Sequence, residues 1–356
     1  MGVSLSSPVP LSVLDLAPVV TGSSSSIALH NTLELAKHVE RLGYSRFWLA
    51  EHHNMPGIAS SAPAVLIGAV ASVTTTLRVG SGGVMLPNHP PLVVAEQFGM
   101  LEGLYPGRID LGLGRAPGTD PRTAAALRRS TSPLSADDFP QQLGELLGYF
   151  ADDPEAPRDG QLHAVPAAGN QVPVWLLGSS LYSAHLAGML GLPFAFAHHF
   201  SSENTLPAAQ AYLSNFRPSS ALAEPYLLIA AAVWAAADDE QAAYLAGPSE
   251  LSFLRLRQGK PSRLPTPEQA ARYPYSEMEK LVMVDRMQGQ IIGGPDTVRK
   301  GIEELVATTG ANELMITTSM HDMAGRLRSY EIVAGLWPPA APSSDAAGDT
   351  SAHSRS

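Results

Sequence analysis

The alternation of apolar runs with amphipathic segments along the chain predicts an α/β fold. Eight runs are apolar almost throughout, which is typical of strands that are buried on both faces of a parallel sheet. They cover residues 11–16, 46–50, 77–86, 108–115, 172–178, 192–197, 226–236 and 313–317. Because helical segments lie between them, the pattern indicates a (β/α)8 TIM barrel with insertions in the loops at its C-terminal face.

The same pattern divides the chain into one folded unit and a tail. Helices are predicted for residues 27–42, 60–76, 90–105, 135–150, 179–191, 237–257 and 296–306, with a closing helix that ends near residue 336. Residues 258–275 are polar and rich in proline, which predicts an insertion that could cover a pocket. We therefore expect a single domain over residues 1–336 and a disordered tail over residues 337–356.

Composition favours an enzyme that acts on small molecules. The 356 residues are 45% hydrophobic, and the formal net charge is -10. Nucleic acid or an anionic membrane would need a basic surface, so neither is expected as a partner. The chain has no cysteine, which excludes thiolate catalysis and disulfides. Residues 1–10 lack the pattern of a signal peptide and no run is long enough to span a bilayer, so we expect a cytoplasmic protein.

Three titratable residues follow the strand predicted at residues 46–50. Glu51, His52 and His53 come directly after an aromatic and apolar run, at the strand end where α/β barrels carry their chemistry. Successive side chains of an extended chain point to opposite faces. One histidine is therefore expected to face the site and the other to be structural, and His52 is the first candidate for a catalytic residue.

A phosphate site is predicted after the fifth strand. Gly178, Ser179, Ser180 and Ser183 combine backbone N–H groups and hydroxyls at the start of a predicted helix, where the helix dipole favours an anion. Ordinary serine capping would explain the same residues. Arg115 favours the phosphate, because it ends a different buried run on the face where barrels bind phosphate.

Two glycines interrupt the third predicted strand. Gly82 and Gly83 would let a flat aromatic ligand approach the backbone, with Met85 against its face, although a β-bulge would also explain them. His89 precedes two prolines and is interpreted as part of a turn. No metal site is predicted, because the histidines show neither an H-E-x-x-H motif nor helical spacing. The nucleophile elbow of serine hydrolases is absent as well.

These motifs together resemble the bacterial luciferase-like family of flavin monooxygenases. The likeness extends from about residue 11 to residue 336, and its most specific segments are residues 48–53, 79–87, 107–115 and 177–180. Four such motifs in this order are specific for the family and much less specific for a substrate. Gly114 stands where light-emitting members carry a reactive cysteine. The resemblance is therefore closer to single-chain, non-luminescent monooxygenases that tailor secondary metabolites, as in antibiotic biosynthesis.

The resemblance implies a barrel that binds reduced FMN at its C-terminal mouth. Arg115 and the residues of the serine turn would hold the phosphate, and a cis peptide bond between Gly82 and Gly83 would lie beneath the ring, which Met85 helps to shape. His52 would stabilise the flavin hydroperoxide formed from dioxygen, which inserts one oxygen atom into an organic substrate. Asp15 and His199 would line the substrate side. Alternatively, they are residues of the barrel mouth whose polar groups are hydrogen-bonded within the protein.

The resemblance also implies partners and leaves alternatives open. Because no nicotinamide-binding fingerprint is visible, we expect the reduced flavin to come from a separate NAD(P)H:flavin reductase. A homodimer is implied, through the helices that follow the second and third strands. The alternatives are a hydride-transferring oxidoreductase that uses the deazaflavin F420, and a flavin-binding barrel without catalysis.

Overall fold

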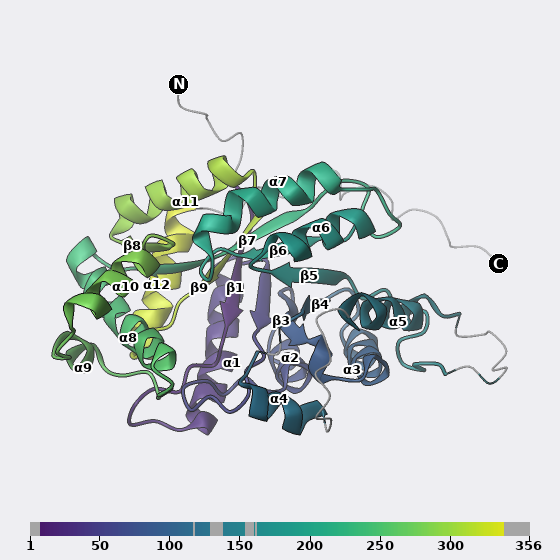
Figure 1. The fold of residues 1–356 in the computed structure, drawn as a ribbon, viewed down its shortest axis with the longest axis horizontal. Helices are drawn as coiled ribbons and strands as arrows, with labels where there is room; N and C mark the ends of the chain where they lie inside the picture. The colour runs from purple at the N-terminus through teal and green to yellow at the C-terminus, as the bar shows by residue number, and fades with distance from the viewer. Residues whose placement is uncertain (1–7, 117, 129–137, 154–159, 161, 338–356) are drawn as a thin grey trace, which may run out of the picture.

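The core of the molecule is a closed parallel barrel (Figure 1), seen in a computed structural model that describes residues 8–116, 118–128, 138–153, 160 and 162–337. Its strands lie in the order β6-β5-β4-β3-β2-β1-β9-β7, and the pairing of β6 with β7 closes the ring. The eight are β1 (Leu11–Asp15), β2 (Arg46–Leu49), β3 (Arg78–Met85), β4 (Ile109–Gly114), β5 (Val174–Gly178), β6 (Phe194–Ala197), β7 (Leu227–Ala235) and β9 (Glu313–Thr317). They match the eight apolar runs, so the predicted TIM barrel is confirmed.

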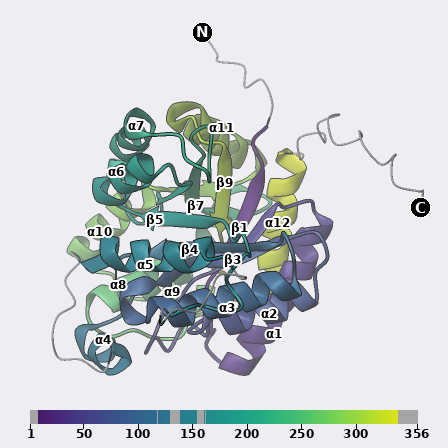
Figure 2. The ribbon, with the colours of Figure 1, turned by 90° about the vertical axis from the view of Figure 1, so that its right-hand side faces the viewer.

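Helices cover the outside of the barrel (Figures 1 and 2). They are α1 (Ser25–Arg41), α2 (Pro63–Ser72), α3 (Pro91–Leu104), α4 (Pro121–Arg128), α5 (Phe139–Ala151), α6 (Leu181–Leu190), α7 (Thr205–Asn215), α8 (Asp239–Arg257), α9 (Pro267–Ala271), α10 (Glu277–Met287), α11 (Pro295–Thr309) and α12 (Met323–Leu336), with short 3-10 turns η1 (Leu86–Asn88) and η3 (Ser202–Asn204). The residues predicted to open α5 before Asp138 lie outside the described residues. The body includes Trp337, which is buried and donates a hydrogen bond to the Val9 carbonyl, and the predicted tail from residue 338 is not described.

The helices α7, α9 and α10 were not predicted, and nor were two further elements, α4 and β8 (Gln290–Gly293). The helix α4 lies in a segment that was interpreted as a loop, because its apolar stretch is short and is flanked by proline and arginine. The strand β8 is only four residues long and half-buried, and it pairs with the last residues of β7 outside the ring. Neither element carries the continuous apolar run that marks a barrel strand.

The proline-rich insertion packs over one end of the barrel. It contains α9 and leads to α10, and both lie beside α8 (Figure 1). Leu264 is buried, and its N–H donates to the carbonyl of Val19 in the loop after β1. This contact holds the insertion against the barrel mouth.

A buried ionic network occupies the N-terminal end of the barrel. Arg46, the first residue of β2, pairs with Asp110 at 2.7 Å and with Glu313, the first residue of β9, at 3.0 Å. Asp110 also accepts from Arg78 at 2.6 Å and from the Trp48 indole at 3.1 Å. These groups fill the N-terminal end of the barrel, so the open space lies at the C-terminal ends of the strands.

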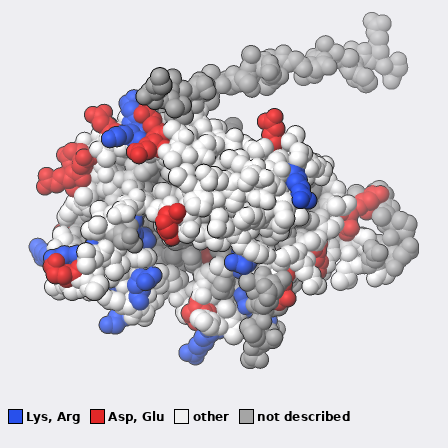
Figure 3. All heavy atoms as spheres, turned by 45° about the horizontal axis from the view of Figure 1, so that its top comes forward, with Lys and Arg blue, Asp and Glu red and all other residues white. Residues whose placement is uncertain are grey.

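The described helices include none long and apolar enough to cross a membrane. On the face drawn in Figure 3, acidic and basic side chains are scattered around a largely uncharged central area.

Candidate active site

Three adjoining spaces that share wall residues form a cavity at the C-terminal ends of the barrel strands. The first chamber, about 200 Å³, is lined by residues that include Leu14, Gly82, Arg115, Ser183 and His199. The second chamber, also about 200 Å³, lies under the insertion and is lined by residues that include Leu16, Met55, Phe253, Leu264 and Arg286. The third space, about 160 Å³, is called the neck here. It shares Gly82, Met85 and His199 with the wall of the first chamber, and it shares His52 and Arg286 with the wall of the second. The predicted site residues therefore border these adjoining spaces, with the exception of Asp15.

The start of α6 forms one end of the first chamber. Ser180 is the N-cap residue, but its side chain makes no capping hydrogen bond. The first N–H groups of α6 consequently need another acceptor, which is the property of an anion site. Arg115 lies with its guanidinium carbon 4.2 Å from the centre of the Tyr182 ring, and it makes no hydrogen bond or ion pair within the described residues. Ser179, Ser180 and Ser183 line the same end, so cation, hydroxyls and free N–H groups lie together.

Gly178 is required by the close packing of β5 against α6. A Cβ atom at this position would lie 2.5 Å from the Cβ of Ser183, closer than two carbon atoms can approach. The absence of a side chain lets the first turn of α6 approach the strand end.

The peptide bond between Gly82 and Gly83 is cis, as the resemblance implied. The register between β3 and β4 shifts here, so the bulge that could explain the glycines is present too. A Cβ at Gly82 would lie 2.7 Å from the Leu14 side chain, inside the barrel. Met85 borders both the first chamber and the neck. A flat ligand could therefore lie against bare backbone at this point, which is the fit that an isoalloxazine ring requires.

His52 faces the cavity, and its imidazole is held neutral. Its Nδ1 lies 3.2 Å from the Gly118 carbonyl oxygen, so Nδ1 carries the proton in the neutral ring. Burial lowers the pKa of His52 from its ordinary value of 6.5, and it outweighs the opposing effects of this hydrogen bond and of Glu51. Nε2 has no partner among the described residues and can accept a proton or a hydrogen bond from a ligand in the neck.

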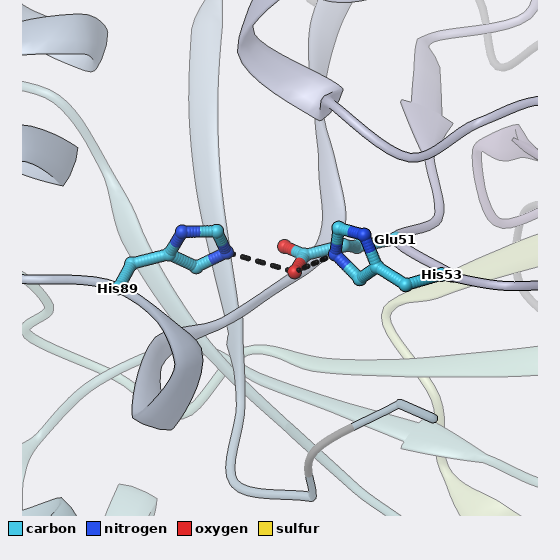
Figure 4. A group of neighbouring side chains, drawn as sticks. All are labelled: Glu51, His53 and His89. Carbon is cyan, nitrogen blue, oxygen red and sulfur yellow. Dashed lines mark hydrogen bonds and ion pairs between the residues drawn. The ribbon is translucent and has the colours of Figure 1, made fainter. Parts of the chain in front are cut away.

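His53 points away from the cavity, as expected for one of two adjacent histidines. Its Nε2 lies 2.8 Å from Oε1 of Glu51, and Nε2 of His89 lies 2.8 Å from the same oxygen (Figure 4). The other oxygen of Glu51 accepts the N–H of Met85 at 3.0 Å. Burial alone would raise the pKa of Glu51, but the hydrogen bonds from His89, His53 and the Met85 N–H lower it. This carboxylate ties the end of β2 to the end of β3 and to η1.

Glu51, His53 and His89 each offer an atom that could bind a metal ion, and these three atoms lie within 4.8 Å of one another. A metal would need a lone pair at Nε2 of both imidazoles. Here each Nε2 lies at hydrogen-bond distance from the carboxylate, which requires a proton there. The absence of a metal stays a prediction. His89, interpreted from the sequence as a turn residue, has this additional bond to Glu51.

The structure places Asp15 away from the cavity, which corrects its expected place on the substrate side. Its side chain is fully buried between β1, α1 and α12, where it accepts from Arg326 at 2.6 Å and from Thr32 at 2.5 Å. Leu14, the preceding residue, faces the first chamber instead. All residues of β1 are buried, so apolar pattern alone could not tell which face Asp15 takes.

His199 does line the first chamber and the neck. Its Nδ1 lies 2.9 Å from the Ala230 carbonyl oxygen, and its ring packs against Phe200 with centres 4.3 Å apart. Burial lowers the pKa of His199 to about 4, with a smaller contribution from the positive charge of Arg286. Its imidazole is therefore neutral near pH 7.

Phe200 and Arg286 are two of the cavity-wall residues that sequence reasoning missed. Phe200 borders all three spaces, and only its place beside His199 pointed to it. Arg286 lines the neck and the second chamber from α10. No motif surrounds Arg286, so the sequence contained no signal for it.

Comparison with known proteins identifies the class of protein that this barrel and cavity define. The model of the luciferase-like monooxygenases matches residues 9–313, and the chain belongs to this family. A luciferase-like monooxygenase of Escherichia coli (strain K12) is 47% identical over 325 residues, which cover 91% of this chain and 96% of that protein.

Two further relatives are similar over nearly their whole length. The N-acetyl-S-alkylcysteine monooxygenase of Bacillus subtilis (strain 168) is 34% identical over 332 residues, 91% of this chain and 96% of that protein. The crystal structure of apo-MsnO8 has 36% sequence identity and a TM-score of 0.85, and the match covers 92% of this chain and 98% of that one.

Proposed function

We propose that the chain is a monooxygenase that uses reduced FMN and dioxygen to transfer one oxygen atom to an organic substrate. One observation carries the proposal: Arg115, the uncapped start of α6 and the Gly82–Gly83 backbone border one cavity, and His52 borders its neck. A ligand with a phosphate at one end and a flat ring at the other would meet complementary groups along this path. Membership of the luciferase-like monooxygenases supports the same reading.

Bound reduced FMN would supply two electrons for dioxygen, whose atoms go to the substrate and to water. The chain would bind and orient the flavin and shield the reaction. Arg115, Gly178, Ser179, Ser180 and Ser183 would hold the phosphate, and Gly82, Gly83 and Met85 would border the ring.

His52 would act at Nε2, which is free to accept a proton or a hydrogen bond from an oxygen group beside the ring. His199 would stand on the substrate side with a neutral ring. The apolar walls of the neck would exclude water from the reacting groups.

Phosphate binding is tested by flavin affinity. Arg115→Gln is expected to weaken FMN binding about ten- to hundredfold, because it removes charge-assisted hydrogen bonds worth about 1.5–3 kcal/mol. It should leave riboflavin binding nearly unchanged, since riboflavin has no phosphate. Arg299→Gln on the exposed surface of α11 is the matched control. Equal FMN affinity in Arg115→Gln and parent would contradict the phosphate assignment.

Turnover is tested by mixing the protein, reduced FMN and air with candidate substrates. N-acetyl-S-alkylcysteines are the first set to try, because a relative is named for them. We expect oxygen uptake to match oxygenated product, with reduced FMN supplied by an added NAD(P)H:flavin reductase. Hydride transfer to F420 without oxygen uptake would favour the deazaflavin alternative, and flavin binding without any turnover would favour a non-catalytic barrel.

A homodimer through α2 and α3 belongs to the same proposal. These helices lie side by side (Figure 2), and their exposed faces carry large apolar side chains, Val65 at 76%, Met100 at 55% and Leu104 at 68% exposure. Light scattering should give twice the mass of one chain, and Val65→Asp should lower it towards that of a monomer.

A further inference from the structure

An arginine stands at each end of the cavity. Among the described residues that line its three spaces, the side chains that are charged near neutral pH are Arg115 in the first chamber and Arg286 in the neck and second chamber. His52 and His199 have lowered pKa values and are neutral there, and no described Asp or Glu lines these spaces. In a chain with a net charge of -10, two arginines without an acidic residue beside them in the walls would favour an anionic ligand.

Arg286 is held in place with its outer edge free. Its guanidinium carbon lies 4.0 Å from the centre of the Phe253 ring, and its Nε donates to Glu250 at 3.3 Å in an ion pair that uses only this edge of the guanidinium. Neither terminal nitrogen has a hydrogen-bond partner within the described part of the chain. Glu250 is itself buried, receives a second hydrogen bond from Gln290 at 2.9 Å and lines none of the three spaces. A stacked guanidinium with two free terminal nitrogens is suited to bind a carboxylate with two parallel hydrogen bonds.

A residue of the second-chamber wall carries a hydroxyl without a hydrogen-bond partner among the described residues. The hydroxyl of Ser252 is buried and lacks a hydrogen-bond partner among the described residues, and it belongs to the same wall as Arg286 and Ser249. A buried hydroxyl without a partner is costly.

The remaining walls of the second chamber are apolar. They are formed by residues that include Leu16, Met55, Ile58, Phe253, Leu256 and Leu264. A ligand here would need an apolar body as well as an anionic group. The neck beyond it leads to His52 and Gly82.

We propose that the second chamber recognises organic substrates that carry a carboxylate, with Arg286 as the residue that selects them. The carboxylate would bind the terminal nitrogens of Arg286, and the apolar body would extend along the chamber towards the neck. That this ligand is a substrate rests on the proposed function. The recognition itself rests on the second chamber alone.

The test measures binding of two probes of equal size and different charge, 4-phenylbutanoate and 4-phenylbutanamide, by calorimetry on the full chain with FMN present. The parent should bind the carboxylate about ten- to hundredfold more tightly than the amide. Arg286→Gln should abolish this preference and leave amide affinity within about twofold, while Arg286→Lys keeps part of it. The control is Arg263→Gln, an exposed arginine of the insertion over the second chamber that lines none of the spaces, and it should behave as the parent.

Equal affinity of the parent for the two probes, no binding of either, or a preference that survives Arg286→Gln would overturn the inference. So would a loss of FMN affinity in Arg286→Gln with the preference intact, because Arg286 would then be a flavin contact. The proposed function fails separately, if the parent forms no oxygenated product from reduced FMN, air and the candidate substrates. An Arg286-dependent preference in such a protein would still establish a carboxylate site.

Discussion

Replacing Asp15 tests whether this residue stabilises the fold or binds substrate. The carboxylate is fully buried, and its partner Arg326 is 3% exposed and also donates from Nε to the Thr318 carbonyl at 2.7 Å. Asp15→Asn keeps the shape of the side chain and leaves Arg326 as a buried charge without its counterion. Breaking such a pair costs about 3–5 kcal/mol.

This cost converts to a measurable shift in melting temperature. A folded unit of about 330 residues has an unfolding entropy of about 0.7 kcal/mol per degree near its melting temperature. Asp15→Asn should therefore lower the Tm by about 4–7 °C, and the double variant with Arg326→Met should lose less than the two single variants together. Arg328→Met on the same helix is the control, because its pair with Glu331 is exposed and worth at most about 1 kcal/mol.

The assay is thermal unfolding followed by circular dichroism, with KM measured on the same preparations. Asp15→Asn should retain the KM of the parent at temperatures well below its Tm. An unchanged Tm together with a clear rise in KM would refute the structural role and restore Asp15 to the substrate side.

Three further predictions concern the site. Because the pKa of His52 is lowered, turnover should be constant near neutral pH and fall only as the pH drops below 6.5 through that lowered value. The variant His52→Gln should lose turnover, while its FMN affinity stays within about threefold of that of the parent. Gly178→Ala should weaken FMN binding and lower stability by about 1–3 kcal/mol, because its Cβ would lie 2.5 Å from that of Ser183; calorimetry and urea unfolding that match the parent would contradict this. Glu51 has a lowered pKa, so the stability that it contributes is complete above its unfolded pKa and declines as pH falls through the folded value. The difference in unfolding free energy between the parent and Glu51→Gln should therefore shrink from pH 6 to pH 3. Dialysis against a chelator should leave this difference unchanged if no metal is bound.

Much of the fold could be predicted from the sequence, because burial on both faces imposes a continuous apolar run on each barrel strand. Strand β7 shows this directly, since all nine of its residues are buried. Strand β8 lacks the signal because it lies outside the ring and is half-buried. The same logic placed Arg115 and Ser179 at one mouth, as both follow parallel strands.

The limits of that reasoning appear at individual side chains. Adjacent positions on a strand diverge, which separated the roles of His52 and His53, yet the pattern could not say which way Asp15 turns in a fully buried strand. Long-range contacts decided the partners: Glu51 meets His89 across 38 positions, and Asp15 meets Arg326 across 311.

The sequence by itself therefore determined the barrel, the mouth at which its chemistry lies and the motifs that gather there, because these depend on local periodicity and on the shared direction of parallel strands. Only the tertiary structure decided that Asp15 is a buried ion-pair partner and that Arg286 faces the cavity. The physical reason is that burial and pairing depend on the elements that pack against a residue, and those elements come from distant parts of the chain.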